Sequence, residues 1–87
     1  MQRFLIAYDI SKNKIRGRAY RLLKKQASSV QKSVFFFEGN SNELAKLERM
    51  LSDIIEKSDS LFIMPCCESS YARSRIYSKD LENLIAV

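Results

Sequence analysis

The sequence predicts an α+β fold in which one antiparallel sheet carries both of its helices on a single face. Short apolar and aromatic runs, typical of buried strands, lie at residues 3–10, 31–38 and 61–64. Two stretches with apolar residues every three or four positions separate these runs. A bend in the middle run would divide it into two strands. The resulting order, β-α-β-β-α-β, is the ferredoxin-like order.

The chain has 87 residues, so we expect a single domain over 1–87. A chain of this size buries only roughly 60–65% of its unfolded surface, and it therefore gains stability from association. A hydrophobic fraction of 46% suits a folded core and excludes a disordered chain. No apolar run approaches the ~20 residues of a membrane span, and no signal-peptide pattern opens the sequence. A cytoplasmic protein with no membrane partner is expected.

The first strand, residues 3–10, leads into a helix predicted over 12–26. Ser11 is the expected N-cap of this helix, because its hydroxyl can accept a hydrogen bond from a free backbone N–H. Four basic residues share one helix face at helical spacing, and their mutual repulsion favours a bound anion: Lys14, Arg18, Arg21 and Lys25.

The next elements are predicted as a turn over 27–30, the bent strand pair over 31–38 and a second helix over 42–56. Asn40 and Glu43 have the spacing of a capping box before that helix, with Ser41 as the rival cap. The strand over 61–64 is expected to stop at Pro65. Residues 66–87 form a tail, in which 68–79 carry no clear pattern and 81–87 regain an apolar one.

Charge is distributed unevenly around the net value of +5. Residues 1–32 hold nine basic side chains and one acid, Asp9, whereas residues 33–87 hold six basic and nine acidic side chains. This asymmetry predicts that one face meets a polyanion such as nucleic acid, and a solvated basic helix is the alternative.

The residue types also limit the chemistry. The chain has no histidine, so hydrolysis would rest on a carboxylate, a hydroxyl or a metal ion. Cys66 and Cys67 are adjacent, a spacing that suits neither a metal knuckle nor a redox pair, and we expect small buried residues there. Asp9 ends the first strand, where a rigid scaffold commonly presents a functional carboxylate. The alternative is that Asp9 only caps the following helix.

The strands are apolar on both faces, although helices should cover only one. Phe62 and Met64, for example, alternate with Leu61 and Ile63. A bare second face would expose a larger apolar patch than soluble monomers usually carry. We therefore expect a homodimer in which two sheets pack against each other around a two-fold axis.

Two sequence motifs, separated by a basic helix, resemble those of a known family. Tyr8-Asp9-Ile10 after an apolar strand, a basic helix, and then Gln31-Lys32-Ser33-Val34-Phe35 are similar to the small CRISPR-associated Cas2 proteins, partners of the Cas1 integrase in spacer acquisition. The resemblance covers residues 1–65. Lys32 departs from it, because an aromatic residue is frequent at that position, and 27–28 replace the usual glycine turn.

The resemblance implies a ferredoxin-like homodimer that acts in CRISPR adaptation, with metal-dependent cleavage of RNA or DNA in some members. By motif match, Asp9 is the acid that binds Mg²⁺, or Mn²⁺, near the dimer axis, and Tyr8 is its catalytic neighbour. Arg16 and Arg18 match the basic helix positions. Gln31, Ser33 and Phe35 make up the second motif. Residues 82–87 would add a strand to the partner's sheet.

Three functional hypotheses follow. The first is a Mg²⁺-dependent endonuclease with one Asp9 from each chain as ligands and Arg16 and Arg18 on substrate phosphates. The second is a non-catalytic scaffold that holds a DNA duplex between integrase subunits, with an affinity that falls steeply with salt. The third is a module that binds single-stranded RNA by stacking bases on Tyr8, Phe35 and Phe37, although the second motif lacks the usual glycine and basic spacing.

Overall fold

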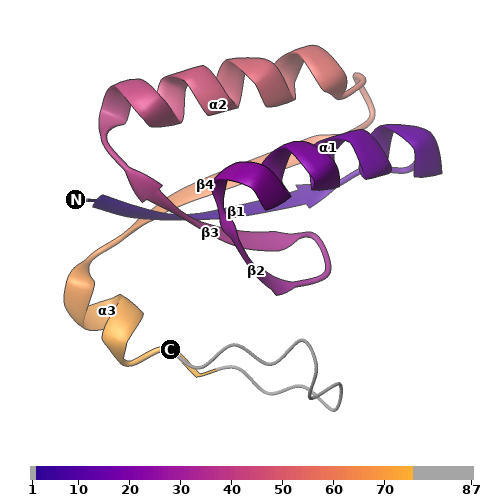
Figure 1. Cartoon of the computed structure of the whole chain (residues 1–87). Coiled ribbons are helices and arrows are strands. Elements are labelled where there is room, and N and C mark those ends of the chain that lie inside the picture. The colour runs from indigo at the N-terminus through magenta and orange to yellow at the C-terminus, as the bar shows by residue number, and fades with distance from the viewer. Residues whose placement is uncertain (1, 76–87) are drawn as a thin grey trace.

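Four strands form one antiparallel sheet, and two long helices lie side by side on one of its faces (Figure 1). The computed structural model describes residues 2–75. In chain order the elements are β1 (Gln2–Asp9), α1 (Asn13–Gln26), β2 (Ser28–Gln31), β3 (Val34–Gly39), α2 (Ser41–Ile54), β4 (Ser60–Cys66) and α3 (Glu68–Ala72). The strand order across the sheet is β2-β3-β1-β4. The predicted α+β class and element order are confirmed, and the short α3 was not predicted.

The core lies between the two long helices and the sheet. Alternate residues of β1 and β3 face it, together with one stripe of each helix. The buried side chains are Phe4, Ile6, Tyr8, Ile10, Ala19, Leu23, Phe35, Phe37, Leu47 and Leu51. Each large one contributes about 1.5–3 kcal/mol by leaving water. No charged side chain is buried within residues 2–75.

The hairpin of β2 and β3 corrects the predicted turn. Residues 28–31 are strand, and the chain turns at Lys32 and Ser33, inside the expected middle run. α1 closes where the Ala27 N–H donates to the Leu23 carbonyl at 2.7 Å, and the backbone is already extended at Ala27. β2 is a mostly polar edge strand, so the sequence contains no apolar pattern that predicts it. Ser33 has a φ of 69°, a left-handed conformation that the sequence does not signal with glycine.

The helix starts agree with the sequence in one case only. At α2 the capping box is present, with the Glu43 N–H donating to Asn40 Oδ1 at 2.8 Å and the Asn40 N–H donating to Glu43 Oε1 at 2.9 Å. At α1 the predicted Ser11 cap is wrong, because Lys12 occupies the cap position and no side chain caps the helix.

β4 and the residues after it also differ from the prediction. The strand continues through Pro65 to Cys66, which is compatible with proline because β4 is an edge strand. Cys66 is half-buried and Cys67 is exposed, so the expectation of two buried thiols is wrong. The predicted strand at 82–87 lies outside the described residues. Within residues 2–75, no helix is long and apolar enough to cross a membrane.

The face of the sheet opposite α1 and α2 is apolar, as predicted. We call it the open face, and it consists of Leu5, Ala7, Val34, Phe36, Phe62 and Met64. The strand register arranges these residues in two rows, Phe36–Leu5–Met64 and Val34–Ala7–Phe62. Phe62 is 56% exposed and Met64 is 43% exposed.

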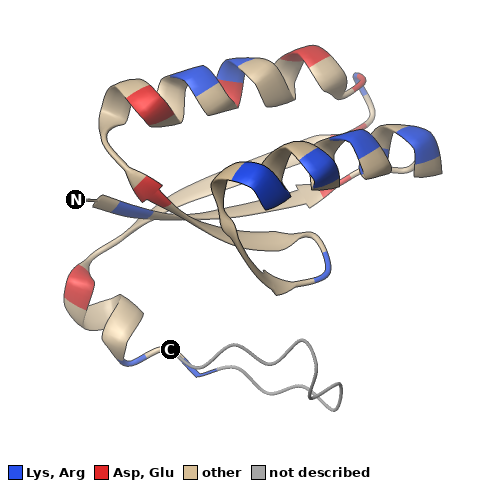
Figure 2. Ribbon diagram, viewed as in Figure 1, with Lys and Arg blue, Asp and Glu red and all other residues tan. Residues whose placement is uncertain are grey.

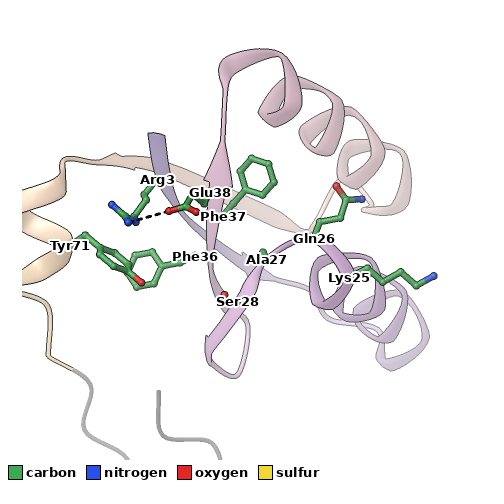
Figure 3. A pocket seen from close by; sticks show the side chains of 9 residues that line it. All are labelled: Arg3, Lys25, Gln26, Ala27, Ser28, Phe36, Phe37, Glu38 and Tyr71. Carbon is green, nitrogen blue, oxygen red and sulfur yellow. Dashed lines mark ion pairs between the residues drawn. The ribbon is translucent and has the colours of Figure 1, made fainter. Parts of the chain in front are cut away.

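α3 shelters one end of the open face. The ring of Tyr71 packs edge-on against Phe36 with 4.9 Å between centroids, and the Arg3 guanidinium lies 4.4 Å from the Tyr71 centroid. Arg3 also pairs with Glu38 across the strands at 3.1 Å (Figure 3). In the same view Lys25 projects away from this group. Tyr71 is therefore a packing residue in the described structure.

Candidate nucleic-acid and metal-binding site

Asp9 is the last residue of β1, and its side chain is exposed. It lies opposite Ser60 of β4 in the strand register. Within residues 2–75, its carboxylate takes part in no ion pair and caps no helix, so the capping alternative is wrong. Successive side chains of a strand point to opposite faces, which places Asp9 on the same side of the sheet as Leu5 and Ala7. The single acid of the basic half thus lies at the margin of the open face.

The loop after Asp9 is fastened to the rest of the fold. The Ser11 N–H donates to Asp59 Oδ1 at 3.2 Å, and the second carboxylate oxygen of Asp59 accepts the Glu56 N–H at 2.8 Å. Arg16 donates from Nη1 to the Ile10 carbonyl at 3.0 Å. These contacts tie the loop to the segment between α2 and β4 and to the first turn of α1. Asp59 was not singled out from the sequence, since a polar residue in a helix–strand turn carries no distinguishing pattern.

Arg16 was predicted to hold substrate phosphates, but its guanidinium is already engaged within the protein. Besides Ile10, it donates to the Asn13 side chain, and it is half-buried. Arg16 therefore stabilises the Asp9 loop. The other predicted basic residues of α1 are all exposed, as expected for a binding face: Lys14, Arg18, Arg21 and Lys25. Figure 2 shows basic bands recurring along α1.

Tyr8 precedes Asp9 in the sequence but belongs to the other face of the sheet. Its side chain is 8% exposed and stacks on Phe35 with 6.3 Å between ring centroids. Burial raises the pKa of the Tyr8 phenol, and a hydrogen bond to the Ser33 side chain offsets part of that increase. Tyr8 is therefore a neutral hydroxyl at neutral pH. The strand alternation separates the predicted catalytic neighbours, Tyr8 and Asp9, onto opposite faces.

The second motif contributes mainly structure. Phe35 is fully buried beneath α1, and Gln31 is exposed at the end of β2. The Ser33 carbonyl accepts the Tyr8 N–H at 3.1 Å, which joins the β2–β3 turn to the end of β1. Because Tyr8, Phe35 and Phe37 are buried against the helices, they are not available to stack on bases. The hypothesis of base stacking on these aromatic residues is wrong.

The structure brings part of the predicted site into one hollow of about 310 Å³ between α1 and the β2–β3 turn. Tyr8, Arg16, Arg21 and Ser33 line it, and Asp9 does not. The other four lining residues were not predicted as site residues: Asn13, Gly17, Tyr20 and Lys32. The departure of Lys32 from the family pattern was the signal that could have identified it.

The part of the chain that the structure describes contains no ready-made cluster of metal-binding side chains. Within residues 2–75, no three Asp, Glu, Cys or His side chains lie close enough together to hold an ion. Mg²⁺ commonly uses one or two carboxylates and completes its shell with waters and substrate phosphate oxygens. The exposed Asp9 carboxylate fits one of these positions.

Known proteins resemble this chain in sequence and in fold. The family model described as CRISPR associated protein Cas2 matches residues 1–74. The CRISPR-associated endoribonuclease Cas2 2 of Methanospirillum hungatei is 40% identical over 68 residues, which are 78% of this chain and 76% of that protein.

Two solved structures share the fold. Streptococcus pyogenes Cas2 superposes with a TM-score of 0.80 at 22% identity, over 87% of this chain and 99% of that one. A chain of a partial Cas6-RT-Cas1–Cas2 complex gives a TM-score of 0.75 at 23% identity, over 97% and 94% of the two chains.

Proposed function

The chain belongs to the CRISPR-associated Cas2 family, and from this premise we propose that it is a metal-dependent endonuclease of CRISPR adaptation that acts as a homodimer. The observation that carries the proposal is the position of Asp9, an exposed carboxylate at the margin of an uncovered apolar sheet face. The relative from Methanospirillum hungatei bears the name endoribonuclease, which favours single-stranded RNA as the first substrate to test.

The open face supports the dimer. Phe62 and Met64 of β4 are exposed. They lie beside Ala7 and Leu5 of β1, which belong to the same apolar face. A second copy that packs its own open face there would remove this apolar surface from water, which is favourable by about 25 cal/mol per Å² buried. We expect such a two-fold arrangement to bring the two Asp9 residues toward one axis, where they would supply two carboxylates to a Mg²⁺ site.

In this proposal each Asp9 carboxylate would hold the ion, with Mn²⁺ as an alternative to Mg²⁺. The bound metal supplies charge neutralisation at the scissile phosphate and a more acidic water. Asp59 and Arg16 keep the backbone after Asp9 in place. Tyr8 lies on the opposite face of the sheet and contributes to packing.

A cleavage assay tests this proposal. Labelled single-stranded RNA and duplex DNA are incubated with the wild-type protein, Asp9→Asn and Asp53→Asn, each with Mg²⁺ or EDTA. Asp53 is an exposed acid of α2 and serves as the matched control. We expect cleavage by the wild type and Asp53→Asn in Mg²⁺ only, and a loss on the order of 100-fold in Asp9→Asn. Undiminished cutting by Asp9→Asn, or cutting in EDTA, contradicts the proposal.

A second candidate function is a DNA-binding scaffold for the Cas1 integrase. The five exposed cations of α1 favour it, and so does the shared fold with a chain of a Cas1–Cas2 complex. A protein that neutralises several duplex phosphates releases their counterions, so its affinity falls steeply with salt. If duplex DNA binds equally well to the wild type and Asp9→Asn, loses affinity steeply with added salt, and is never cut, the scaffold function holds alone.

A further inference from the structure

We propose that the hollow between α1 and the β2–β3 turn binds one phosphorylated nucleotide of a nucleic-acid strand, with its phosphate between Arg21 and Lys32. The inference rests on the proposed function only in that the ligand is nucleic acid. The hollow excludes Asp9, so it is a binding site apart from the proposed metal site.

The charge of the hollow points to an anion. Three cations line it, namely Arg16, Arg21 and Lys32, and no acidic side chain does. The ion pairs found within residues 2–75 join Arg3 to Glu38 and Lys12 to Glu56, so neither Arg21 nor Lys32 is neutralised by a carboxylate there. Converging cations with no counterion favour a bound phosphate, whose oxygens accept several charge-assisted hydrogen bonds.

Gly17, one helical turn before Arg21, leaves room for the Arg21 side chain beside the hollow. A methyl group added at Gly17 would lie 3.3 Å from Nη1 of Arg21, so the guanidinium folds back over the bare helix backbone at this point. Gly17 itself lines the hollow. Arg16 lies on the same wall but is held by Ile10 and Asn13. Arg21 is therefore the arginine whose donors remain for a ligand.

The opposite wall is a turn of fixed shape. Lys32 and Ser33 form it, and the Ser33 carbonyl holds the Tyr8 N–H at 3.1 Å. The left-handed backbone of Ser33 is part of this turn. Residues in such backbone conformations cluster at ligand-binding sites, because the surrounding structure must hold them there. Lys32 therefore extends from a well-defined backbone, and it lines the same hollow as Arg21.

The size and the remaining lining favour a nucleotide over a bare phosphate. About 310 Å³ is at the lower end of the range for small-molecule pockets, and a phosphate alone would leave most of it empty. Tyr20 is 38% exposed, and its ring is fixed edge-on against Phe35 at 5.8 Å. Lys24 Nζ also lies over this ring, 5.5 Å from its centroid, and the part that stays exposed is a surface on which a base or sugar packs. The hydroxyls of Tyr8 and Ser33 add neutral polar groups.

Binding of short RNA in EDTA tests the inference without any cleavage. The probes are one fluorescent RNA tetramer with a 5′-phosphate and the same tetramer with a 5′-hydroxyl, followed by anisotropy. We expect Lys32→Gln and Arg21→Gln each to weaken binding about tenfold, the loss of one charge-assisted contact. Lys46→Gln removes the same charge from the exposed face of α2 and should change binding less than twofold. Thermal unfolding confirms that each variant is folded.

The two tetramers show whether the hollow binds a terminal 5′-phosphate or an internal phosphodiester. Tighter binding of the 5′-phosphate tetramer that disappears in Lys32→Gln identifies a terminal phosphate. Equal binding of both tetramers, weakened equally by Lys32→Gln, identifies an internal phosphodiester. A change in Lys32→Gln and Arg21→Gln no larger than in Lys46→Gln overturns the inference. Because Asp9 is intact in all these proteins, that result leaves the nuclease proposal standing, and a failed nuclease assay leaves this binding result standing.

Gly17→Ala provides a variant that keeps every charge. The added methyl displaces the Arg21 guanidinium by a few tenths of an ångström, while alanine improves the helix by itself. We expect weaker binding of the tetramer together with an undiminished melting temperature. Binding as tight as in the wild type would show that the fold-back of Arg21 over Gly17 is unimportant.

Discussion

The carboxylate of Asp59 holds the backbone of Ser11, whose N–H donates to Oδ1 at 3.2 Å. The two residues are 48 positions apart in the chain, and the contact joins the loop after β1 to the loop before β4. The other oxygen of Asp59 accepts the Glu56 N–H at 2.8 Å. One side chain thus fixes two loops at the end of the sheet where Asp9 lies.

Asp59→Ala should destabilise the protein by about 1–2 kcal/mol, because two backbone N–H groups lose a charged acceptor. Urea unfolding measures the change, with Asp53→Ala as an exposed control of the same residue type. We also expect a lower rate of cleavage at saturating substrate with little change in KM, since Asp59 positions the loop and does not touch substrate. A stability within 0.3 kcal/mol of the wild type, roughly the error of additivity, would contradict this role.

Arg16→Lys should separate the structural and phosphate-binding interpretations of Arg16. Lysine keeps the charge but cannot reproduce a guanidinium that contacts Ile10 and Asn13 together. We expect a loss of about 1 kcal/mol in the free energy of unfolding, without a change in the salt dependence of nucleic-acid binding. Arg18→Gln is the matched opposite case, with full stability and a shallower salt dependence. A shallower salt dependence in Arg16→Gln, which removes the charge, would restore the phosphate role.

Phe62→Glu should convert the proposed dimer into a monomer. Phe62 is 56% exposed in the single chain, so a polar residue there costs the monomer fold little, whereas a dimer interface would have to bury a charge. Light scattering at micromolar concentration measures the mass. Cleavage should fall with the dimer, because one chain offers only one Asp9. Asn42→Glu, at an exposed position of α2, serves as a control for the added charge. A monomeric wild type would refute the dimer directly.

The reactivity of Cys67 should change near neutral pH. Its Sγ lies 3.0 Å from Ser70 Oγ and 3.4 Å from Ser69 Oγ, and these hydroxyls lower the pKa of the thiol to about 7. A lowered pKa means that the thiolate prevails above about pH 7 and is lost below it. We expect the rate of iodoacetamide labelling at Cys67, measured in Cys66→Ser by mass spectrometry, to rise with a midpoint near pH 7. A midpoint in Ser69→Ala/Ser70→Ala as low as in the intact sequence would exclude the hydroxyls as the cause.

The sequence was sufficient to predict the helices and strands that bury an apolar stripe. β1, α1, β3 and α2 each display the period of their secondary structure, and the capping box of Asn40 and Glu43 marked one helix start. β2 and α3 were not predicted correctly, because a polar edge strand and a five-residue helix carry no period that can be distinguished from a loop. Cys66 and Cys67 were assigned to the interior by residue type alone, which does not account for their place after an edge strand.

The candidate site was predictable in its residue types but not in its geometry. Asp9 is exposed at a strand end, as its position after an apolar run indicated. Its neighbour Tyr8 is on the other face, which the alternation of a strand already requires. The side-chain orientation of Arg16 could not be inferred, because the same helix face and charge suit both a phosphate and the Ile10 carbonyl. Lys32 became a site residue only when the turn placed it in the same hollow as Arg21.

The turn at Lys32 and Ser33 restricts the number of residues in the hairpin more strictly than it restricts which residue types form the turn. Since the Ser33 carbonyl is bonded to the Tyr8 N–H, one extra residue would shift every following side chain of β3 to the opposite face of the sheet. Phe35 and Phe37 would then leave the core, and the open face would receive them. A library of variants at this turn should therefore accept many substitutions at Lys32 but almost no insertions or deletions. A change in the length of the hairpin is therefore tolerated only if the core residues change with it.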